Sequence, residues 1–176
     1  MNYIIIDTSG EYLTVIYKLR SRAESEQDSL LSERRKLATL DRVGIHRDSS
    51  ALMHSQTLMP AIAEILGEKR LKAIDCIGVV VGPGSFTGVR IGITTAKAFA
   101  FCDPRLKLVA IELQEGGQGQ IINDKVERES QGVANGEEPL SREQIIRKIF
   151  DDKVGRGEFC GINELNPLYS YSKYDE

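Results

Sequence analysis

The sequence has few of the residues that build metal centres and disulfide frameworks. Its 176 residues include three cysteines, Cys76, Cys102 and Cys160, none of them in a C-x-x-C pair, and two histidines, His46 and His54, eight positions apart. Two imidazoles that bind a metal from one helix face stand four residues apart, and structural zinc sites need closely spaced ligands. We therefore expect no metal site, no disulfide framework, and buried thiols in a reducing compartment.

Excess basic charge, a long apolar run and a basic leader are also lacking. The formal net charge is −3, with 28% charged and 41% hydrophobic residues, which is typical of a soluble globular protein. The first apolar run ends at Asp7, too early for a membrane span or a signal peptide. We expect a cytoplasmic protein of one domain or two small lobes, without membrane contact, in which any contact with RNA needs a local patch or a partner.

Hydrophobic patterning predicts an α/β fold within residues 1–113. Short β-branched runs predict strands, and longer apolar periodicities closed by glycine or proline predict helices. The expected order is strand, strand, strand, helix, strand, helix, strand, at residues 3–6, 12–17, the end of a weak apolar stretch at 37–45, 54–66, 74–81, 89–101 and 106–113. Pro60 should lie in the first turn of the first helix, capped by Ser55 or Thr57, because proline is tolerated there.

Two regions depart from this regular pattern. Residues 18–48 are dense in both charge signs and predict a charged excursion that leads into the third strand. After residue 113 the pattern weakens, and one helix is expected near residues 141–150. We therefore expect a complete first lobe at 1–113 and a reduced or atypical second lobe or tail at 114–176, with an acidic balance that disfavours contact with a phosphate backbone.

The segment Gly82–Gly92 carries the most information. It follows a β-branched strand, so Gly82–Gly88 predicts a loop that opens the second helix. A P-loop would need a lysine, and the dinucleotide fingerprint would need a glycine where Thr87 stands, so neither nucleotide motif is satisfied. Small residues recur here every four positions, at Gly84, Gly88, Gly92, Ala96 and Ala100. Such a stripe favours close packing of a helix on a sheet or on another helix over ligand binding.

The turn Asp7-Thr8-Ser9-Gly10 stands at the tip of a predicted hairpin. A carboxylate and hydroxyls at a strand end could position a metal-bound nucleotide phosphate, with Ser85 and Thr87 as further candidate contacts. An ordinary hairpin turn is the simpler interpretation. Aspartic-protease chemistry is disfavoured, because a serine interrupts the Asp-Thr-Gly pattern and no second copy exists.

No catalytic residue emerges from the remaining side chains. No serine or cysteine has a recognisable neighbouring base, so nucleophilic catalysis is unsupported. Leu58 stands where a second metal ligand to pair with His54 would be needed, which favours a surface or capping role for that histidine.

Three segments together resemble the TsaB (YeaZ) family: Ile4–Ser9 (IIIDTS), His54–Pro60 (HSQTLMP) and Gly82–Gly92 (GPGSFTGVRIG). The resemblance covers residues 1–113. It implies an actin-like ATPase (ASKHA, ribonuclease H-like) lobe with a mixed five-stranded sheet and flanking helices, and here a truncated second lobe. It also implies a non-catalytic scaffold or dimerisation subunit of the complex that makes N6-threonylcarbamoyladenosine in tRNA.

The resemblance implies partners as well. They are a TsaD-like transferase paralogue that carries the metal, a TsaE-like ATPase of the same pathway, a second copy of the chain when it is alone, and tRNA only indirectly. The expected contact is a four-helix face that includes Leu58, Met59, Ile62, Gly88, Gly92 and Ala96. No cofactor is expected.

Two alternatives remain open from the residues. The first is an actin-like ATPase or small-molecule kinase that binds ATP or ADP with Mg²⁺ weakly, using Asp7 for the metal and Gly82–Gly88 for the phosphates. The second is a degenerate relative that has kept only the fold.

Overall fold

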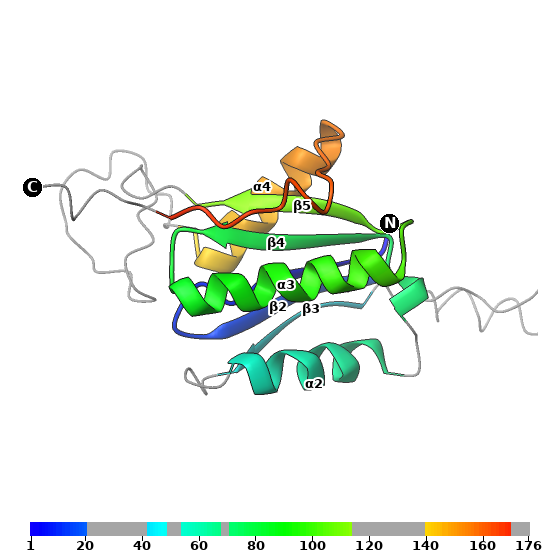
Figure 1. Cartoon of the computed structure of the whole chain (residues 1–176). Helices are drawn as coiled ribbons and strands as arrows, with labels where there is room; N and C mark the ends of the chain where they lie inside the picture. Colours follow the sequence, from blue (N-terminus) through cyan, green and yellow to red (C-terminus); the bar gives the residue numbers. More distant parts are fainter. Residues whose placement is uncertain (21–41, 49–53, 68–70, 114–139, 170–176) are drawn as a thin grey trace, which may run out of the picture.

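A computed structural model describes residues 1–20, 42–48, 54–67, 71–113 and 140–169, which form a mixed sheet with helices on both faces (Figure 1). The strands are β1 (Tyr3–Asp7), β2 (Leu13–Leu19), β3 (Arg42–Asp48), β4 (Cys76–Gly82) and β5 (Lys107–Glu112). The helices are α2 (His54–Leu66), α3 (Phe86–Cys102) and α4 (Arg142–Gly155), with a short 3-10 turn η2 (Leu71–Ala73). The predicted element order and the mixed five-stranded sheet are confirmed.

The hairpin strand β1 lies at the centre of the sheet, whose strand order is β3-β2-β1-β4-β5. It pairs antiparallel with β2, with Ile5 opposite Ile16, and parallel with β4, with Ile5 opposite Gly78. Strand β5 is parallel to β4 on its other side. Because the carboxyl ends of parallel strands share one edge of a sheet, the turn after β1 lies beside the loop after β4.

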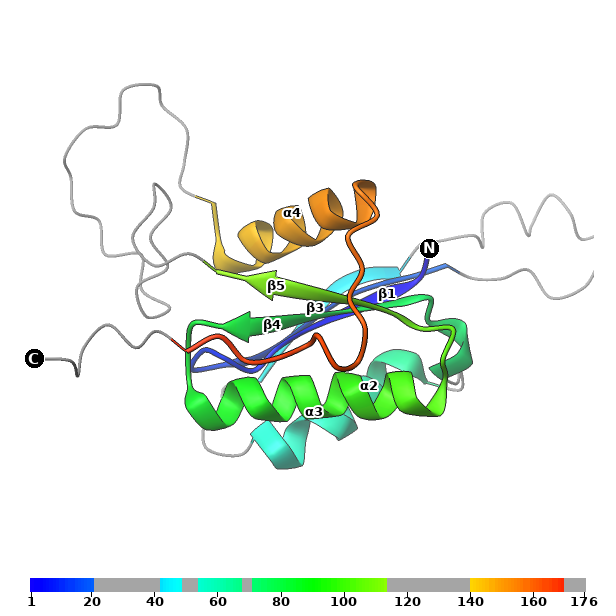
Figure 2. The ribbon, with the colours of Figure 1, turned by 45° about the horizontal axis from the view of Figure 1, so that its top comes forward.

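Alternate residues of β1 face two separate hydrophobic clusters. Ile4 and Ile6 belong to the cluster under α2 and α3, whereas Ile5 belongs to the cluster under α4. Figure 2 shows the two helices α2 and α3 on one side of the sheet and α4 on the other. The continuous apolar run in β4 is buried along its whole length, as expected for a parallel strand covered on both faces.

Helix α4 is anchored by a large aromatic side chain. Phe150 is fully buried, and the centroid of its ring lies 4.7 Å from that of Tyr3. Gly78 leaves the space for it, because a Cβ atom added there would lie 2.8 Å from Phe150 Cδ2. The predicted helix near residues 141–150 is therefore present, and it closes the second face of the sheet.

The chain after α4 crosses the β5 edge to the other face. Cys160 forms an isolated antiparallel bridge with Leu108, and Leu165 is fully buried in the cluster under α2 and α3. Leu168 N then donates to Val81 O at 2.7 Å. Residues 140–169 thus pack on the sheet of the first lobe. The division at residue 113 stays a prediction, and residues 21–41 of the charged excursion and 114–139 of the tail lie outside the described residues.

Three local predictions about the helix starts and His54 are wrong, and the expectation of buried thiols is wrong for Cys102, which is exposed. Helix α3 begins at Phe86 rather than at residue 89, because the Ser85 side chain caps it by accepting from Gly88 N at 3.2 Å. Helix α2 begins at His54, so Pro60 stands at its seventh position, beyond the first turn, and Ser55 and Thr57 lie within the helix rather than capping it. His54 is buried rather than on the surface, and within the described residues its Nε2 has no hydrogen-bond partner.

None of the helices among the described residues has the length and apolar character needed to cross a membrane.

The stripe of small residues can be tested on α3 itself. Ala96 is fully buried against the sheet, whereas Ala98 on the same helix is exposed. We expect Ala96→Leu to lower the free energy of unfolding by about 1–3 kcal/mol, because a larger side chain overpacks a filled core. Ala98→Leu is the matched control and should change it by less than about 0.5 kcal/mol. Equal melting temperatures for the two variants would contradict this packing.

The three thiols should differ in reactivity. Burial raises the pKa of Cys76 to about 12, with Lys107 opposing the shift and Asp75 adding to it, and burial also raises the pKa of Cys160. Because the thiolate is the nucleophile, a pKa this high leaves about one Cys76 in ten thousand reactive at pH 8.

We expect the exposed Cys102 to account for the rapid phase with Ellman's reagent at pH 8. Cys102→Ser should remove that phase, and Cys76 should react only after denaturation. Rapid labelling of Cys76 in the native protein, identified by peptide mass, would contradict its buried position.

Candidate functional site

The turn after β1 is buried and internally hydrogen bonded. Asp7, Thr8 and Ser9 are each at most 3% exposed. Asp7 Oδ1 accepts from Ser9 N at 2.9 Å and from Ser9 Oγ at 2.7 Å, which is the local bonding that favours aspartate in tight turns. The hairpin turn predicted from the sequence is present, and its carboxylate stands at the end of the central strand.

The loop after β4 and the start of α3 pack directly on this turn. Ser85 N donates to Ser9 O at 2.8 Å, and Thr8 Oγ1 donates to Gly88 O at 2.7 Å. A Cβ atom added at Gly84 would lie 2.6 Å from Ser9 Cβ, and one added at Gly88 would collide with Thr8 O. Glycine is required at these two positions because backbone meets backbone there.

Sequence reasoning missed one residue of this site, Arg142 at the start of α4. Its Nε donates to Asp7 Oδ2 at 2.8 Å. Its Nη2 donates to Ser9 Oγ at 2.8 Å and more weakly to Asp7 Oδ1 at 3.4 Å. The side chain is 16% exposed. The one local signal was the capping box of Ser141 and Gln144, which predicts a helix start but not its partner, 135 residues away.

A second ion pair lies beside the first. Glu143, the next residue of α4, is buried and pairs with Arg47 of β3. The Arg47 guanidinium also lies 5.6 Å from the centroid of the Tyr12 ring. The first turn of α4 is thus held to β1 by its cation and to β3 by its anion.

The same edge of the sheet carries an exposed aromatic and cationic cluster. The Arg90 guanidinium lies 3.8 Å from the centroid of the Phe86 ring, and Arg90 Nε donates to Tyr169 Oη at 2.8 Å. The Phe86 and Tyr169 rings stack with centroids 4.8 Å apart. These contacts tie the last described residues to the first two turns of α3.

The candidate nucleotide contacts have definite positions in this arrangement. Asp7, Thr8 and Ser9 are buried, and their side chains bond to protein groups; Ser85 caps α3. Thr87 is exposed on the first turn of α3. Within the described ranges, no three or more His, Cys, Asp or Glu side chains gather as they would around a metal ion.

The six candidate interface residues differ in burial, and most of them are not at the surface. Five of the six are buried in the lobe: Leu58, Ile62, Gly88, Gly92 and Ala96. A Cβ atom at Gly92 would lie 2.6 Å from Thr8 Oγ1 and 3.3 Å from Val79 Cγ2, so the stripe packs on the sheet. Met59 is the sixth and is 48% exposed. A partner of α2 and α3 would therefore meet the outer sides of the helices.

Comparisons with known proteins find similarity over part of the chain. The family model for TsaD, tRNA N6-adenosine threonylcarbamoyltransferase, matches residues 30–111. The TsaB protein of threonylcarbamoyladenosine biosynthesis from Bacillus subtilis is 46% identical over 50 residues, 27% of this chain and 22% of that protein. The threonylcarbamoyltransferase of Zymomonas mobilis is 35% identical over 75 residues, 42% of this chain and 20% of that protein. The chain therefore spans about a fifth of the length of the curated relatives it matches.

Two solved structures from Pseudomonas aeruginosa share the fold over nearly the whole chain. An uncharacterized protein with similarity to the peptidase YeaZ superposes with a TM-score of 0.62 and 17% identity, covering 96% of this chain and 98% of the other. YeaZ itself gives 0.61 and 18%, covering 96% and 99%. The chain has the fold of these structures. Its predicted resemblance to the TsaB (YeaZ) family is confirmed by the partial sequence match to the Bacillus subtilis protein.

Proposed function

We propose that this chain is a non-catalytic scaffold subunit of the complex that makes N6-threonylcarbamoyladenosine in tRNA. The similarity to TsaB and the YeaZ fold support this role. One observation carries the non-catalytic part: the turn after β1 and the loop after β4 bond to each other, so their polar groups hold the lobe together. A catalytic site instead presents its polar groups to a reactant.

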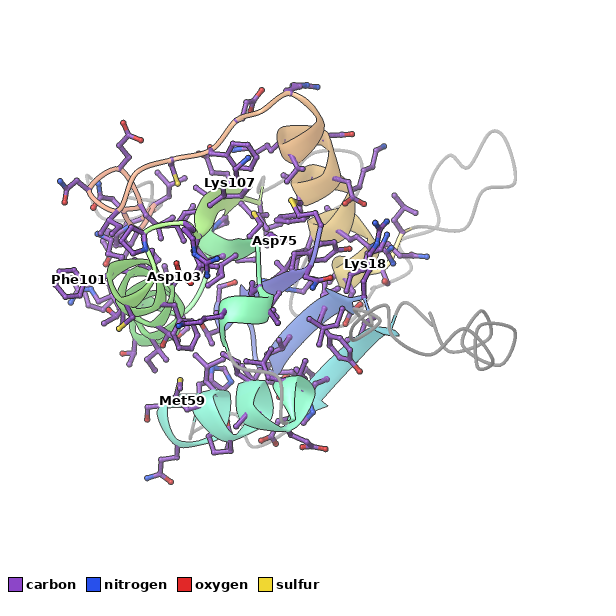
Figure 3. All side chains as sticks on the ribbon, turned by 90° about the vertical axis from the view of Figure 1, so that its right-hand side faces the viewer. Lys18, Met59, Asp75, Phe101, Asp103 and Lys107 are labelled. Carbon is purple, nitrogen blue, oxygen red and sulfur yellow. The ribbon has the colours of Figure 1, made fainter. Side chains whose placement is uncertain are left out.

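The proposed partner is a TsaD-like transferase of similar fold. Helices α2 and α3 lie on the same face of the sheet, and their outer sides can meet a matching helix pair. Met59 on α2 and Phe101 near the end of α3 are 48% and 81% exposed, and both lie on this side of the molecule (Figure 3). We call the outer sides of these helices around Met59 and Phe101 the α2/α3 surface.

The remaining members of the assembly follow from the same proposal. The α2/α3 surface would join two copies of the chain when the transferase is absent, and a TsaE-like ATPase would join the assembled pair. The tRNA would be held mainly by the transferase, since this chain has a net charge of −3. Such a role would place the chain in the cytoplasm.

The kinase or ATPase alternative is not favoured. It needs Asp7 free to hold a metal and a loop free to hold phosphates. Asp7 is paired with Arg142, and the loop after β4 is packed on the turn after β1.

The proposal predicts a stable complex with the TsaD-like protein of the same cell. The two purified proteins should co-elute from a sizing column, and tRNA threonylcarbamoylation by the transferase should require this chain. This chain alone should modify no tRNA. Full transferase activity in its absence, with no co-elution, would contradict the scaffold role.

The α2/α3 surface predicts which substitutions weaken that complex. A charge at the centre of an apolar contact must be desolvated, so we expect Met59→Asp with Phe101→Asp to raise the Kd at least about tenfold. The matched control is Ile45→Asp, which charges a hydrophobic residue of similar exposure on the edge strand β3. It should leave the Kd unchanged. An equal rise in the Kd for the Met59→Asp/Phe101→Asp variant and for Ile45→Asp would contradict the assignment of the α2/α3 surface as the contact with the transferase.

A further inference from the structure

A row of polar residues crosses the sheet beneath the first turn of α4. Asp7 of β1 is opposite Thr14 of β2, and Thr14 is opposite Arg47 of β3. Directly paired residues point to the same face of a sheet, so the row presents an acid at one end and a base at the other. Arg142 pairs with the acid and Glu143 with the base. The charges of the helix therefore match those of the sheet in order and in sign.

Both oxygens of the Asp7 carboxylate accept hydrogen bonds from protein groups. Oδ1 accepts from Ser9 N and Ser9 Oγ, and Oδ2 accepts from Arg142 Nε. The carboxylate is 2% exposed, and Arg142 also donates to Ser9 Oγ at 2.8 Å. Arginine holds a carboxylate through two nitrogens in a fixed plane, which makes this a strong and directional pair.

The residues at this turn do not fit the magnesium-bound nucleotide that an actin-like fold implies. Mg²⁺ takes oxygen ligands at about 2.0–2.1 Å in an octahedron, usually a carboxylate and phosphates. Here a guanidinium lies against the carboxylate where such a cation would have to stand, and its positive charge would repel the metal. The hydroxyls of Thr8 and Ser9 bond to protein groups, and Ser85 caps α3.

We propose that Arg142 is a built-in counter-ion that takes the place of a metal at Asp7, and that docking of α4 closes the turn to cations. The same charge that would attract a metal instead holds the first turn of α4 on the sheet. Glu143 and Arg47 fix the register of that docking. Arg142 plays this role within the lobe, whether or not the chain binds a transferase.

Cation binding by the full chain tests the proposal, with Mn²⁺ as the probe in place of Mg²⁺. The wild-type protein should show no saturable Mn²⁺ or Mg·ADP binding at millimolar concentration by calorimetry. Arg142→Met keeps the apolar stem and removes the charge, so it should bind Mn²⁺ saturably, with a Kd at least about tenfold below the highest concentration at which the wild type shows no binding. Asp7→Asn in that background should abolish the gain. Arg142→Lys keeps the charge and should behave like the wild type.

The control substitution is Arg156→Met, at the other end of α4, where the arginine side chain is 71% exposed. It should alter neither Mn²⁺ binding nor the melting temperature. Asp7-dependent binding of Mn²⁺ or Mg·ADP by the wild-type protein would overturn the proposal. So would an Arg142→Met protein that folds and binds Mn²⁺ no better than the wild type.

A folding measurement decides the case in which Arg142→Met does not fold. Removing one partner leaves a buried charge uncompensated, whereas removing both removes the penalty. The double variant Asp7→Asn/Arg142→Met should then recover a cooperative melting transition. Failure of the double variant as well would show that Arg142 serves something other than the charge of Asp7, and it would overturn the proposal.

Discussion

The contact between the β1 turn and the start of α3 is the constraint on which the rest of the structure depends. The backbone of Thr8 and Ser9 lies so close to Gly84 and Gly88 that no Cβ atom fits between them. Two hydrogen bonds, Ser85 N to Ser9 O and Thr8 Oγ1 to Gly88 O, satisfy the buried polar groups that this approach creates. Helix α3 is thereby fixed on the sheet at its first turn. Its stripe of small residues is buried, and Gly92 lies against Val79 of β4.

The C-terminal residues complete the lobe from the other side. Phe150 and Ile146 of α4 are fully buried and provide the apolar area that stabilises the docked helix. The two ion pairs of its first turn add less net stability, since burying charges costs desolvation. Their complementary order selects one placement of α4, because a helix shifted along the sheet would leave Asp7 or Arg47 facing the wrong charge. Apolar burial therefore stabilises the docked helix, and the charges determine where along the sheet it docks.

This division of roles bears on how the similarity to known proteins is interpreted. The threonylcarbamoyltransferase family model matches residues 30–111, which include the whole glycine-rich segment. In this chain that segment serves packing, as the fit of Gly88 and Gly92 against Thr8 demonstrates. A match in this segment therefore indicates a similar lobe and does not distinguish a transferase from a scaffold. Function must then be argued from the outer surface and from the residues that the lobe leaves available.

The local elements follow from patterns in the sequence. The β-branched runs at 3–6 and 74–81, the apolar periodicity of 54–66 and the glycine-rich turn predict the sheet and its helices, because each pattern depends on neighbours within a few residues. The four-residue spacing of glycine and alanine likewise predicts a close-packed helix face. The packing partner of that face follows only from the three-dimensional fold: the sheet covers it, so Gly92 and Ala96 are interior. Leu58 and Ile62 of α2 are buried in the same hydrophobic cluster as Ala96. The pairing of Asp7 with Arg142 was decided in the same way. A charge 135 residues away leaves no trace in local spacing, and only the fold of α4 across the sheet brings the two side chains together.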